Sequence, residues 1–196
     1  MKKVSDGHFE IPFLFRSGFK NEEKRALCKA ASKLIRPDSV IFIDESTTLL
    51  PICRMLAETE KVTVITNGIS TAALLQEFNI NAYCTGGRIR SSSQSCVGPH
   101  AERLIDMFHF DIAFFSAYGF SKEGLTETSM HEAELKRAVL NNASKKVFLA
   151  DSDKFNRVGP YRIARASDMD VIITNGDIPM DIPTENTEII RIKSDF

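Results

Sequence analysis

The chain has 196 residues, of which 43% are hydrophobic, and this fraction is too high for an intrinsically disordered protein. Its ten glycines and seven prolines are too few for a low-complexity or collagen-like chain, and its length suits one large domain or at most two small ones. The 25 basic and 26 acidic residues nearly cancel, which argues against a protein that holds nucleic acid through a general positive field.

The cysteines and the start of the chain indicate a reducing compartment. No two cysteines have C-x-x-C spacing, so neither a zinc ribbon nor a thioredoxin-like site is expected, and their small or apolar neighbours predict buried free thiols. The start lacks the apolar segment of a signal peptide, and no stretch approaches the roughly 18 apolar residues of a membrane span. We therefore expect a cytoplasmic protein without membrane contact. The four cysteines are Cys28, Cys53, Cys84 and Cys96.

The first twenty residues differ from the rest of the chain. Phe9, Phe13, Phe15 and Phe19 lie among glycine and proline without a clear period. A free, solvated tail rarely carries four phenylalanines. Two interpretations stay open: an arm that packs on the domain or on a second subunit, or a linker from a domain that this chain does not include. We therefore assign residues 1–20 to a linker or arm and residues 21–196 to one domain.

From residue 21 onward, helical and strand patterns alternate. Asn21 is a favourable N-cap, and Glu22 and Glu23 suit the first turn of a helix. Apolar spacing and turn residues then predict the elements in chain order. The predicted helices span 21 to just before 37, 47–57, 69–78, 101–108 and 130–143. The predicted strands span 39–44, 61–66, 80–85, 110–116, 146–150, 170–174 and 187–192.

The strands are apolar throughout and do not alternate with polar residues, so both faces of the sheet should be covered. Strands of this kind that alternate with helices predict a mostly parallel sheet with helices on both faces. No repeat and no second composition regime appears after residue 20. We therefore predict a single α/β domain.

Polar or small residues follow five successive predicted strands. Ligands of open α/β sheets bind beyond the carboxyl ends of the strands, so these residues predict one shared cleft. The strand ends read Asp44-Glu45-Ser46-Thr47-Thr48, Thr66-Asn67-Gly68, Gly86-Gly87-Arg88, Ser116-Ala117-Tyr118-Gly119 and Asp151-Ser152-Asp153-Lys154.

Two of these strand ends have chemistry that suits a phosphate. Ser46, Thr47 and Thr48 offer three hydroxyls at a predicted helix start, beside backbone N–H groups without helical partners. The alternative is that they only cap the helix. Lys154 is expected to anchor the ligand as a point charge, although an exposed lysine paired with a neighbouring aspartate would look the same in the sequence.

Other candidate motifs are weaker. His131-Glu132 begins like the zinc motif H-E-x-x-H, but Leu135 stands at the fifth position, and we assign no metal ligand anywhere. The charged residues of that segment are expected to form a solvated helix face. They are Glu132, Glu134, Lys136 and Arg137. We expect no cofactor and no catalytic residue.

The order of the motifs resembles the effector-sensing domain of DeoR-type bacterial transcription regulators, from about Arg16 to Thr174. The D-x-x-T-T and D-S-x-K-F elements, in that order, are fairly specific. The motifs are Glu23-Lys24-Arg25, Asp44-Glu45-Ser46-Thr47-Thr48, Thr66-Asn67, Gly86-Gly87, Gly98, Gly124 followed by a helix with Glu134-Leu135-Lys136-Arg137, and Asp151-Ser152-Asp153-Lys154-Phe155.

This resemblance implies a fold similar to ribose-5-phosphate isomerase and a phosphorylated sugar or related metabolite as ligand. It also implies a homo-oligomer, and operator DNA bound only through an N-terminal winged helix-turn-helix that this chain lacks. The ligand would change operator affinity, usually relieving repression. The strand ends and the resemblance together predict these ligand-binding residues: Asp44, Ser46, Thr47, Thr48, Thr66, Asn67, Gly86, Gly87, Gly124 and Lys154.

The sequence departs from the family pattern at Ser46, where D-x-G-T-T has glycine. A sugar-phosphate isomerase is the alternative function, because the resemblance extends to that fold. Such an enzyme needs a carboxylate base near the reacting carbonyl. The related isomerase carries D-G-A-D where this chain has Ser116-Ala117-Tyr118-Gly119, so we expect a binding domain and not an enzyme. A purely structural dimerisation domain is a third interpretation.

Overall fold

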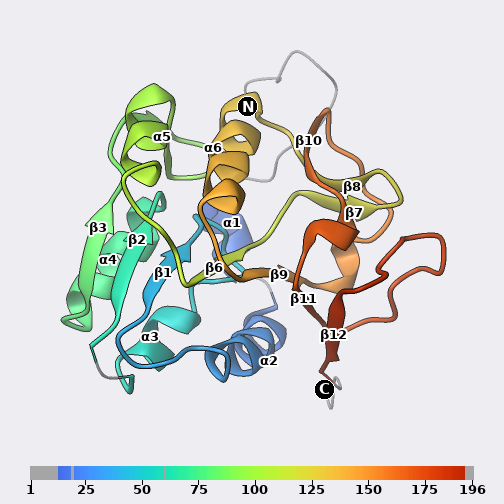
Figure 1. Cartoon of the computed structure of the whole chain (residues 1–196), viewed down its shortest axis with the longest axis horizontal. Coiled ribbons are helices and arrows are strands. Elements are labelled where there is room, and N and C mark those ends of the chain that lie inside the picture. The colour runs from blue at the N-terminus through green and yellow to red at the C-terminus, as the bar shows by residue number, and fades with distance from the viewer. Residues whose placement is uncertain (1–12, 19, 60, 193–196) are drawn as a thin grey trace.

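A computed structural model of the chain describes residues 13–18, 20–59 and 61–192 (Figure 1). The predicted arm over 1–20 is described only at helix α1 (Phe13–Gly18) and at Lys20. The rest of that prediction lies outside the described residues.

A seven-stranded parallel sheet forms the centre of the domain, with the strand order β12-β11-β9-β6-β1-β2-β3. Figure 1 shows it running from β3 on the left to β12 on the right. The strands are β1 (Val40–Ile43), β2 (Thr63–Thr66), β3 (Asn81–Cys84), β6 (Ile112–Phe115), β9 (Lys146–Ala150), β11 (Val171–Thr174) and β12 (Glu188–Arg191).

Helices cover both faces of this sheet because successive strand side chains point to opposite faces and are apolar on both. Ile41 and Ile43 pack with α2 (Asn21–Ser32), α3 (Ile52–Leu56) and α4 (Ile69–Glu77). Phe42 packs on the other face with α5 (Pro99–Ile105) and α6 (Met130–Asn141). Within the described ranges, no helix has the length and apolar character needed to cross a membrane. The predicted fold class, an α/β domain with a mostly parallel sheet and helices on both faces, is confirmed.

Two small antiparallel sheets add strands that the sequence analysis did not predict. β4 (Arg88–Arg90) pairs with β5 (Ser95–Val97), and β8 (Gly124–Glu127) lies between β7 (Gly119–Ser121) and β10 (Tyr161–Ala164). These strands mix glycine, polar and apolar residues, so they lack the continuous apolar runs that predicted the central strands. They matter for function because the ends of β5 and β8 place polar side chains near the carboxyl ends of the central strands.

The helix predicted over 47–57 is wrong in its first half. Residues 47–51 form successive turns, in which the Leu49 N–H donates to the Ser46 carbonyl at 3.0 Å and the Ile52 N–H to the Leu49 carbonyl at 3.0 Å. Pro51 has no N–H for an earlier helical turn, and α3 begins only at Ile52. Thr47 therefore does not lie at a helix start, and the argument from helical N–H groups does not apply to it.

The predictions for β3 were wrong in two respects. All four of its side chains are exposed, so this edge strand is not covered on both faces. Cys84 lies on it and is exposed, whereas the other three cysteines are buried as predicted. The Cys84 Sγ lies 4.0 Å from the Cys96 Sγ.

We expect one thiol of the native protein to react rapidly with a disulfide reagent, and three to react only after unfolding. Cys84 is the accessible thiol, whereas burial and the neighbouring Cys84 raise the pKa of Cys96 to about 11. Burial also raises the pKa of Cys53 to about 12, which suppresses the reactive thiolate. Reagent titration before and after addition of denaturant measures both classes. The Cys84→Ser variant should lose the rapid class, and rapid reaction of a second native thiol would contradict the buried placement.

Candidate functional site

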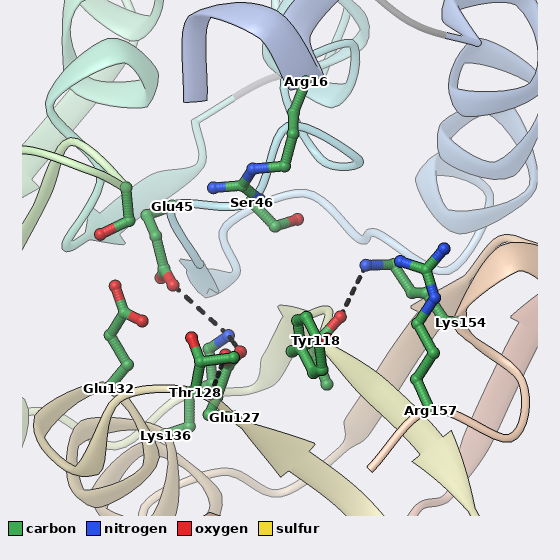
Figure 2. Close-up of a pocket in the computed structure, with 12 residues that line it drawn as sticks. Arg16, Glu45, Ser46, Tyr118, Glu127, Thr128, Glu132, Lys136, Lys154 and Arg157 are labelled. Carbon is green, nitrogen blue, oxygen red and sulfur yellow. Dashed lines mark hydrogen bonds and ion pairs between the residues drawn. The ribbon is translucent and has the colours of Figure 1, made fainter. Parts of the chain in front are cut away.

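A small pocket opens where the carboxyl ends of β1, β6 and β9 meet (Figure 2). Its volume of about 110 Å³ is below the roughly 300–1,000 Å³ that holds a drug-sized ligand, so it suits a small metabolite. The lining residues are Arg16, Glu45, Ser46, Ser93, Ala117, Tyr118, Glu127, Thr128, Glu132, Lys136, Lys154 and Arg157.

Some of the predicted ligand-binding residues meet at this pocket. Ser46 and Lys154 line it directly. Asp44 and Asn67 are buried behind the lining: the Asp44 carboxylate lies 3.3 Å from the Lys136 Nζ, and the Asn67 amide donates to Glu45 at 2.9 Å. Thr47, Thr48 and Thr66 are also buried.

The three predicted glycines do not line the pocket. Gly86 and Gly87 lie between β3 and β4 with φ of 65° and 99°, a region that L side chains rarely adopt. Gly124 begins β8 with φ of 96°, and a Cβ there would run into the Ala164 backbone. The chain path accounts for these glycines without a ligand.

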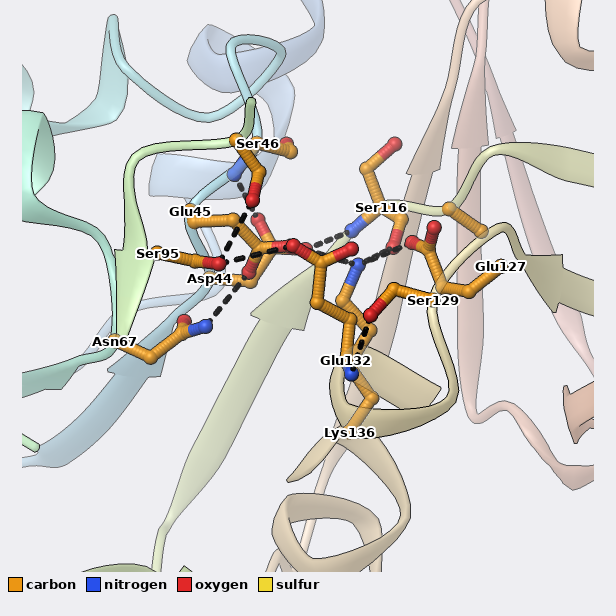
Figure 3. A network of polar contacts seen from close by, with 12 residues as sticks. Asp44, Glu45, Ser46, Asn67, Ser95, Ser116, Glu127, Ser129, Glu132 and Lys136 are labelled. Atoms are coloured by element: carbon orange, nitrogen blue, oxygen red, sulfur yellow. Dashed lines mark hydrogen bonds and ion pairs between the residues drawn. The ribbon is translucent and has the colours of Figure 1, made fainter. Parts of the chain in front are cut away.

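Lys136 of α6 holds the carboxylates around it in one buried network (Figure 3). Its Nζ lies 3.3 Å from Asp44, 3.4 Å from Glu45 and 2.6 Å from Glu127, and it donates to the Ser116 carbonyl at 2.9 Å. Burial opposes the charge of Lys136, but the carboxylates outweigh it and raise the pKa of this ammonium. One fixed cation thus sets the position of three acidic side chains.

Glu132 stands one helical turn from Lys136 and faces a different set of partners. Its Oε1 accepts from the Ser95 hydroxyl at 2.9 Å and lies 3.4 Å from Arg90 Nη1. Burial and the neighbouring carboxylates of Glu45 and Glu127 raise the pKa of Glu132 to about 8. Glu132 therefore carries a proton through part of the neutral pH range.

The solvated helix face predicted for this segment is wrong for Glu132 and Lys136, which are both 2% exposed. It holds for Arg137, which is exposed. Residues 132 and 136 are four apart and share the face of α6 that meets β1 and β8. Both side chains are therefore buried in the domain and do not face solvent. The helical periodicity of the sequence does not predict this burial, because charged residues are expected on the solvent side of a helix.

The opposite side of the pocket is cationic. Lys154 is partly buried, which lowers its pKa, and its Nζ donates to the Ala117 carbonyl at 2.6 Å. Arg157 follows it in the chain, and Figure 2 shows both side chains across the pocket from Glu45 and Glu132. The pocket therefore has an acidic wall and a basic wall.

Two hydroxyls of pocket-lining residues lack a hydrogen-bond partner among the described residues. They are the buried Oγ of Ser46 and the buried Oγ1 of Thr128. A buried hydroxyl without a partner costs about 1–3 kcal/mol, so such groups are usually satisfied by water or a ligand. The pocket is therefore lined by polar groups that need partners.

The sequence analysis missed several of these lining residues. Glu127 is the last residue of β8, a strand that was not predicted, and Thr128 follows it; Arg157 lies in the connection that leads to β10. Glu45 belongs to the strand end Asp44-Glu45-Ser46-Thr47-Thr48, but it was not among the predicted ligand-binding residues. A polar residue directly after a strand was the signal that found Ser46, and it would also have found Glu45.

Solved structures with a similar fold include sugar-phosphate isomerases and translation initiation factors. A D-ribose-5-phosphate isomerase is similar with a TM-score of 0.52 and 17% identity, covering 68% of this chain and 53% of that one. eIF2B beta from Chaetomium thermophilum is similar with a TM-score of 0.53 and 16% identity, covering 78% of this chain and 50% of that one. These similarities confirm the predicted isomerase-like fold.

Curated relatives at higher identity are named as transcriptional regulators. GolR of Listeria innocua, an HTH-type transcriptional regulator, is 36% identical over 159 residues, which are 80% of this chain and 63% of that protein. The putative aga operon transcriptional repressor of Escherichia coli O157:H7 is 33% identical over 168 residues, or 85% and 62%. The glycerol-3-phosphate regulon repressor of Haemophilus influenzae is 27% identical over 169 residues, or 85% and 66%.

The chain thus spans somewhat less than two thirds of the length of the first two of these relatives. Residues 20–176 match the family model described as the DeoR C terminal sensor domain. That range holds the pocket except for Arg16. The family and the names of its members indicate regulators and not enzymes. The chain belongs to the family of DeoR C-terminal sensor domains.

Proposed function

We propose that this chain is the effector-sensing part of a transcriptional regulator of carbohydrate metabolism, and that its pocket binds a phosphorylated sugar or a closely related metabolite. The observation that carries the proposal is the division of one small pocket into a basic wall and an acidic wall, with two lining hydroxyls that have no partner in the part of the chain that the structure describes. A sugar phosphate has the matching division into an anionic end and a polyol end.

The phosphate is assigned to the basic wall. Lys154 and Arg157 supply charge there, and Ser46 supplies a hydroxyl that lacks a partner among the described residues. An ammonium has three donors, so the bond from Lys154 to the Ala117 carbonyl leaves donor capacity for a phosphate oxygen. Thr47 is a weaker candidate, because its Oγ1 already accepts from Lys24 Nζ at 3.2 Å.

The sugar hydroxyls are assigned to the acidic wall. Carboxyl oxygens accept hydrogen bonds from hydroxyls, and Glu45, Glu127 and Glu132 are held in place by the Lys136 network and by Ser95. Thr128 adds a hydroxyl that can donate or accept. Residues fixed in advance lose little freedom on binding, which favours recognition of a polyol by shape and hydrogen bonding.

The proposed role in transcriptional regulation is supported by the names of the relatives. Two of them are named as repressors, one of an aga operon and one of a glycerol-3-phosphate regulon, and the latter name contains a phosphorylated polyol. We propose that operator DNA is bound through an N-terminal helix-turn-helix outside the sensor domain. The effector would change operator affinity in a cytoplasmic homo-oligomer. The net charge of −1 supports a domain that does not itself bind DNA.

A screen of sugar and polyol phosphates by thermal unfolding tests the proposal. A ligand at 100 times its Kd should add about 2.7 kcal/mol to the free energy of unfolding, while the corresponding unphosphorylated sugar should add little. The same compounds should show no turnover. A screen without any phosphate-dependent shift, or measurable isomerisation of a hit, would contradict the sensor assignment.

Lys154→Met is expected to lower the affinity for a phosphorylated hit by tenfold or more. The variant keeps the aliphatic stem but removes a charge-assisted contact of about 1.5–3 kcal/mol. Lys122→Met is the matched control, because Lys122 is exposed in the β7–β8 turn and does not line the pocket. Isothermal titration calorimetry measures both variants. Equal affinity of Lys154→Met and wild type would remove Lys154 from the site.

A further inference from the structure

We infer that helix α1 is part of the effector site, with Arg16 as a phosphate ligand, so that an occupied pocket holds the N-terminal segment against the domain. The inference rests on the proposed function, because it assigns one more residue and a regulatory consequence to the same pocket. Arg16 lines the pocket but belongs to α1, which precedes α2, the first helix of the domain over residues 21–196.

Arg16 enters the pocket from above, beside Ser46. Figure 2 shows it entering from α1, on the same side of the pocket as Ser46 and opposite the acidic side chains of Glu127 and Glu132. A guanidinium binds phosphate through two parallel N–H donors, a geometry that ammonium groups do not offer. Together with Lys154 and Arg157, it places three cationic side chains around one small volume.

Phe13 is the residue of α1 whose side chain is buried against the domain. Its N–H donates to the Ser92 carbonyl at 3.0 Å. Leu14 and Phe15 are 73% and 66% exposed, so the remaining apolar side chains add little. A six-residue helix is marginal without tertiary contacts, so its docking depends on what its polar groups contact.

Lys24 connects α1 to the loop that carries Ser46. It is buried on α2, and its Nζ donates to the Arg16 carbonyl at 2.5 Å and to Thr47 Oγ1 at 3.2 Å. Lys20 forms a second connection, an ion pair of 2.7 Å with Asp153 beside Lys154. The helix, the Ser46 loop and the Lys154 loop are therefore joined around the basic wall.

Cationic side chains repel one another around the basic wall. Burial lowers the pKa of Lys24 to about 8; Asp151 acts to raise this pKa, whereas Lys154 and Arg16 act to lower it. A phosphate dianion between Arg16 and Lys154 would replace repulsion by attraction. A ligand shifts an equilibrium by the difference between its affinities for the two states, so occupancy should favour the docked position of α1.

For regulation, this means that the bound effector would contact α1 directly, and α1 continues toward the N-terminus. In the regulator proposed above, the DNA-binding part precedes α1. Restraint of α1 by the bound phosphate would then restrict where that part can lie relative to the sensor domain. No second site and no long pathway through the sheet is needed.

Hydrogen exchange of the α1 amides, with inorganic phosphate as the probe, tests the inference. Phosphate at tens of millimolar should slow exchange over residues 13–18 in the wild type relative to chloride at equal ionic strength. Arg16→Met should abolish this protection and weaken phosphate binding by tenfold or more. Arg25→Met, an exposed arginine on α2 outside this pocket, should behave as wild type.

The outcomes separate the inference from the proposed function. Arg16→Met with wild-type phosphate affinity and undiminished protection of α1 would overturn the inference and leave the sensor site standing. Wild type that binds neither inorganic phosphate nor any sugar phosphate of the screen would overturn both. Unfolding curves without ligand should overlay for wild type and Arg16→Met, so that reduced affinity cannot come from a damaged fold.

Discussion

Lys136→Met is expected to lower the free energy of unfolding by about 3–5 kcal/mol, the cost of leaving buried charges without their partner. Lys136 is 2% exposed and is the ammonium shared by Asp44, Glu45 and Glu127. Its removal leaves three carboxylates close together in a dry environment, and at least one must take up a proton. Urea denaturation at pH 7, followed by circular dichroism, measures the loss.

Two further variants make this result interpretable. Arg137→Met on the same helix removes an exposed guanidinium that donates to the Arg162 carbonyl, and it should cost no more than about 1 kcal/mol. Glu127→Gln combined with Lys136→Met should recover part of the loss, because one uncompensated charge is removed. Equal stability of Lys136→Met and Arg137→Met would show that the buried network is not a major stabilising element.

The central sheet could be predicted from the sequence because its strands carry a strong local signal. Runs such as the one over 40–43 are apolar at every position, as expected for a strand with both faces covered. The exposed edge strand β3 shows the limit of this reasoning. Its place at the edge follows from the strand order, which local patterns do not encode.

Only some of the polar residues of the site could be predicted from the sequence. Ser46 and Lys154 were found because the carboxyl ends of parallel strands meet at one edge of a sheet. Glu132 and Lys136 were assigned to solvent, because a charged residue on a helix is rarely buried unless it is paired. Their partners come from β1 and β8, which lie close to α6 only after folding. Pairing between distant segments is the information that a single sequence lacks.

The two walls of the pocket are built from different kinds of structure. The acidic wall is fixed by short contacts such as the 2.6 Å pair of Lys136 and Glu127. The basic wall is built from a turn, a loop and the short helix α1. In the sensor proposed above, the acidic wall would select the ligand, and α1 would report its presence.

Glu132→Gln is expected to remove a pH dependence from the stability of the protein. Burial and the nearby carboxylates of Glu45 and Glu127 raise the pKa of Glu132 from its ordinary value of 4.5 to about 8, against the opposing effect of Arg90 and Lys136. A carboxyl whose pKa is higher in the folded state binds a proton on folding. Its contribution to stability is therefore present below pH 4.5 and is lost as the pH rises toward 8.

Glutamine mimics the protonated carboxyl and does not titrate, and its amide oxygen can still accept from the Ser95 hydroxyl. Wild type and Glu132→Gln should therefore have similar stability at pH 5. The variant should become more stable than wild type as the pH rises to 8, by about 1.4 kcal/mol for each unit of pKa shift at most. Other buried groups, such as Asp44, titrate in both proteins and cancel in the comparison. Urea denaturation at one-unit steps from pH 5 to 8 measures the difference. A constant difference across that range would show that Glu132 has the same pKa in the folded and unfolded protein, and would remove the protonated carboxyl from the acidic wall.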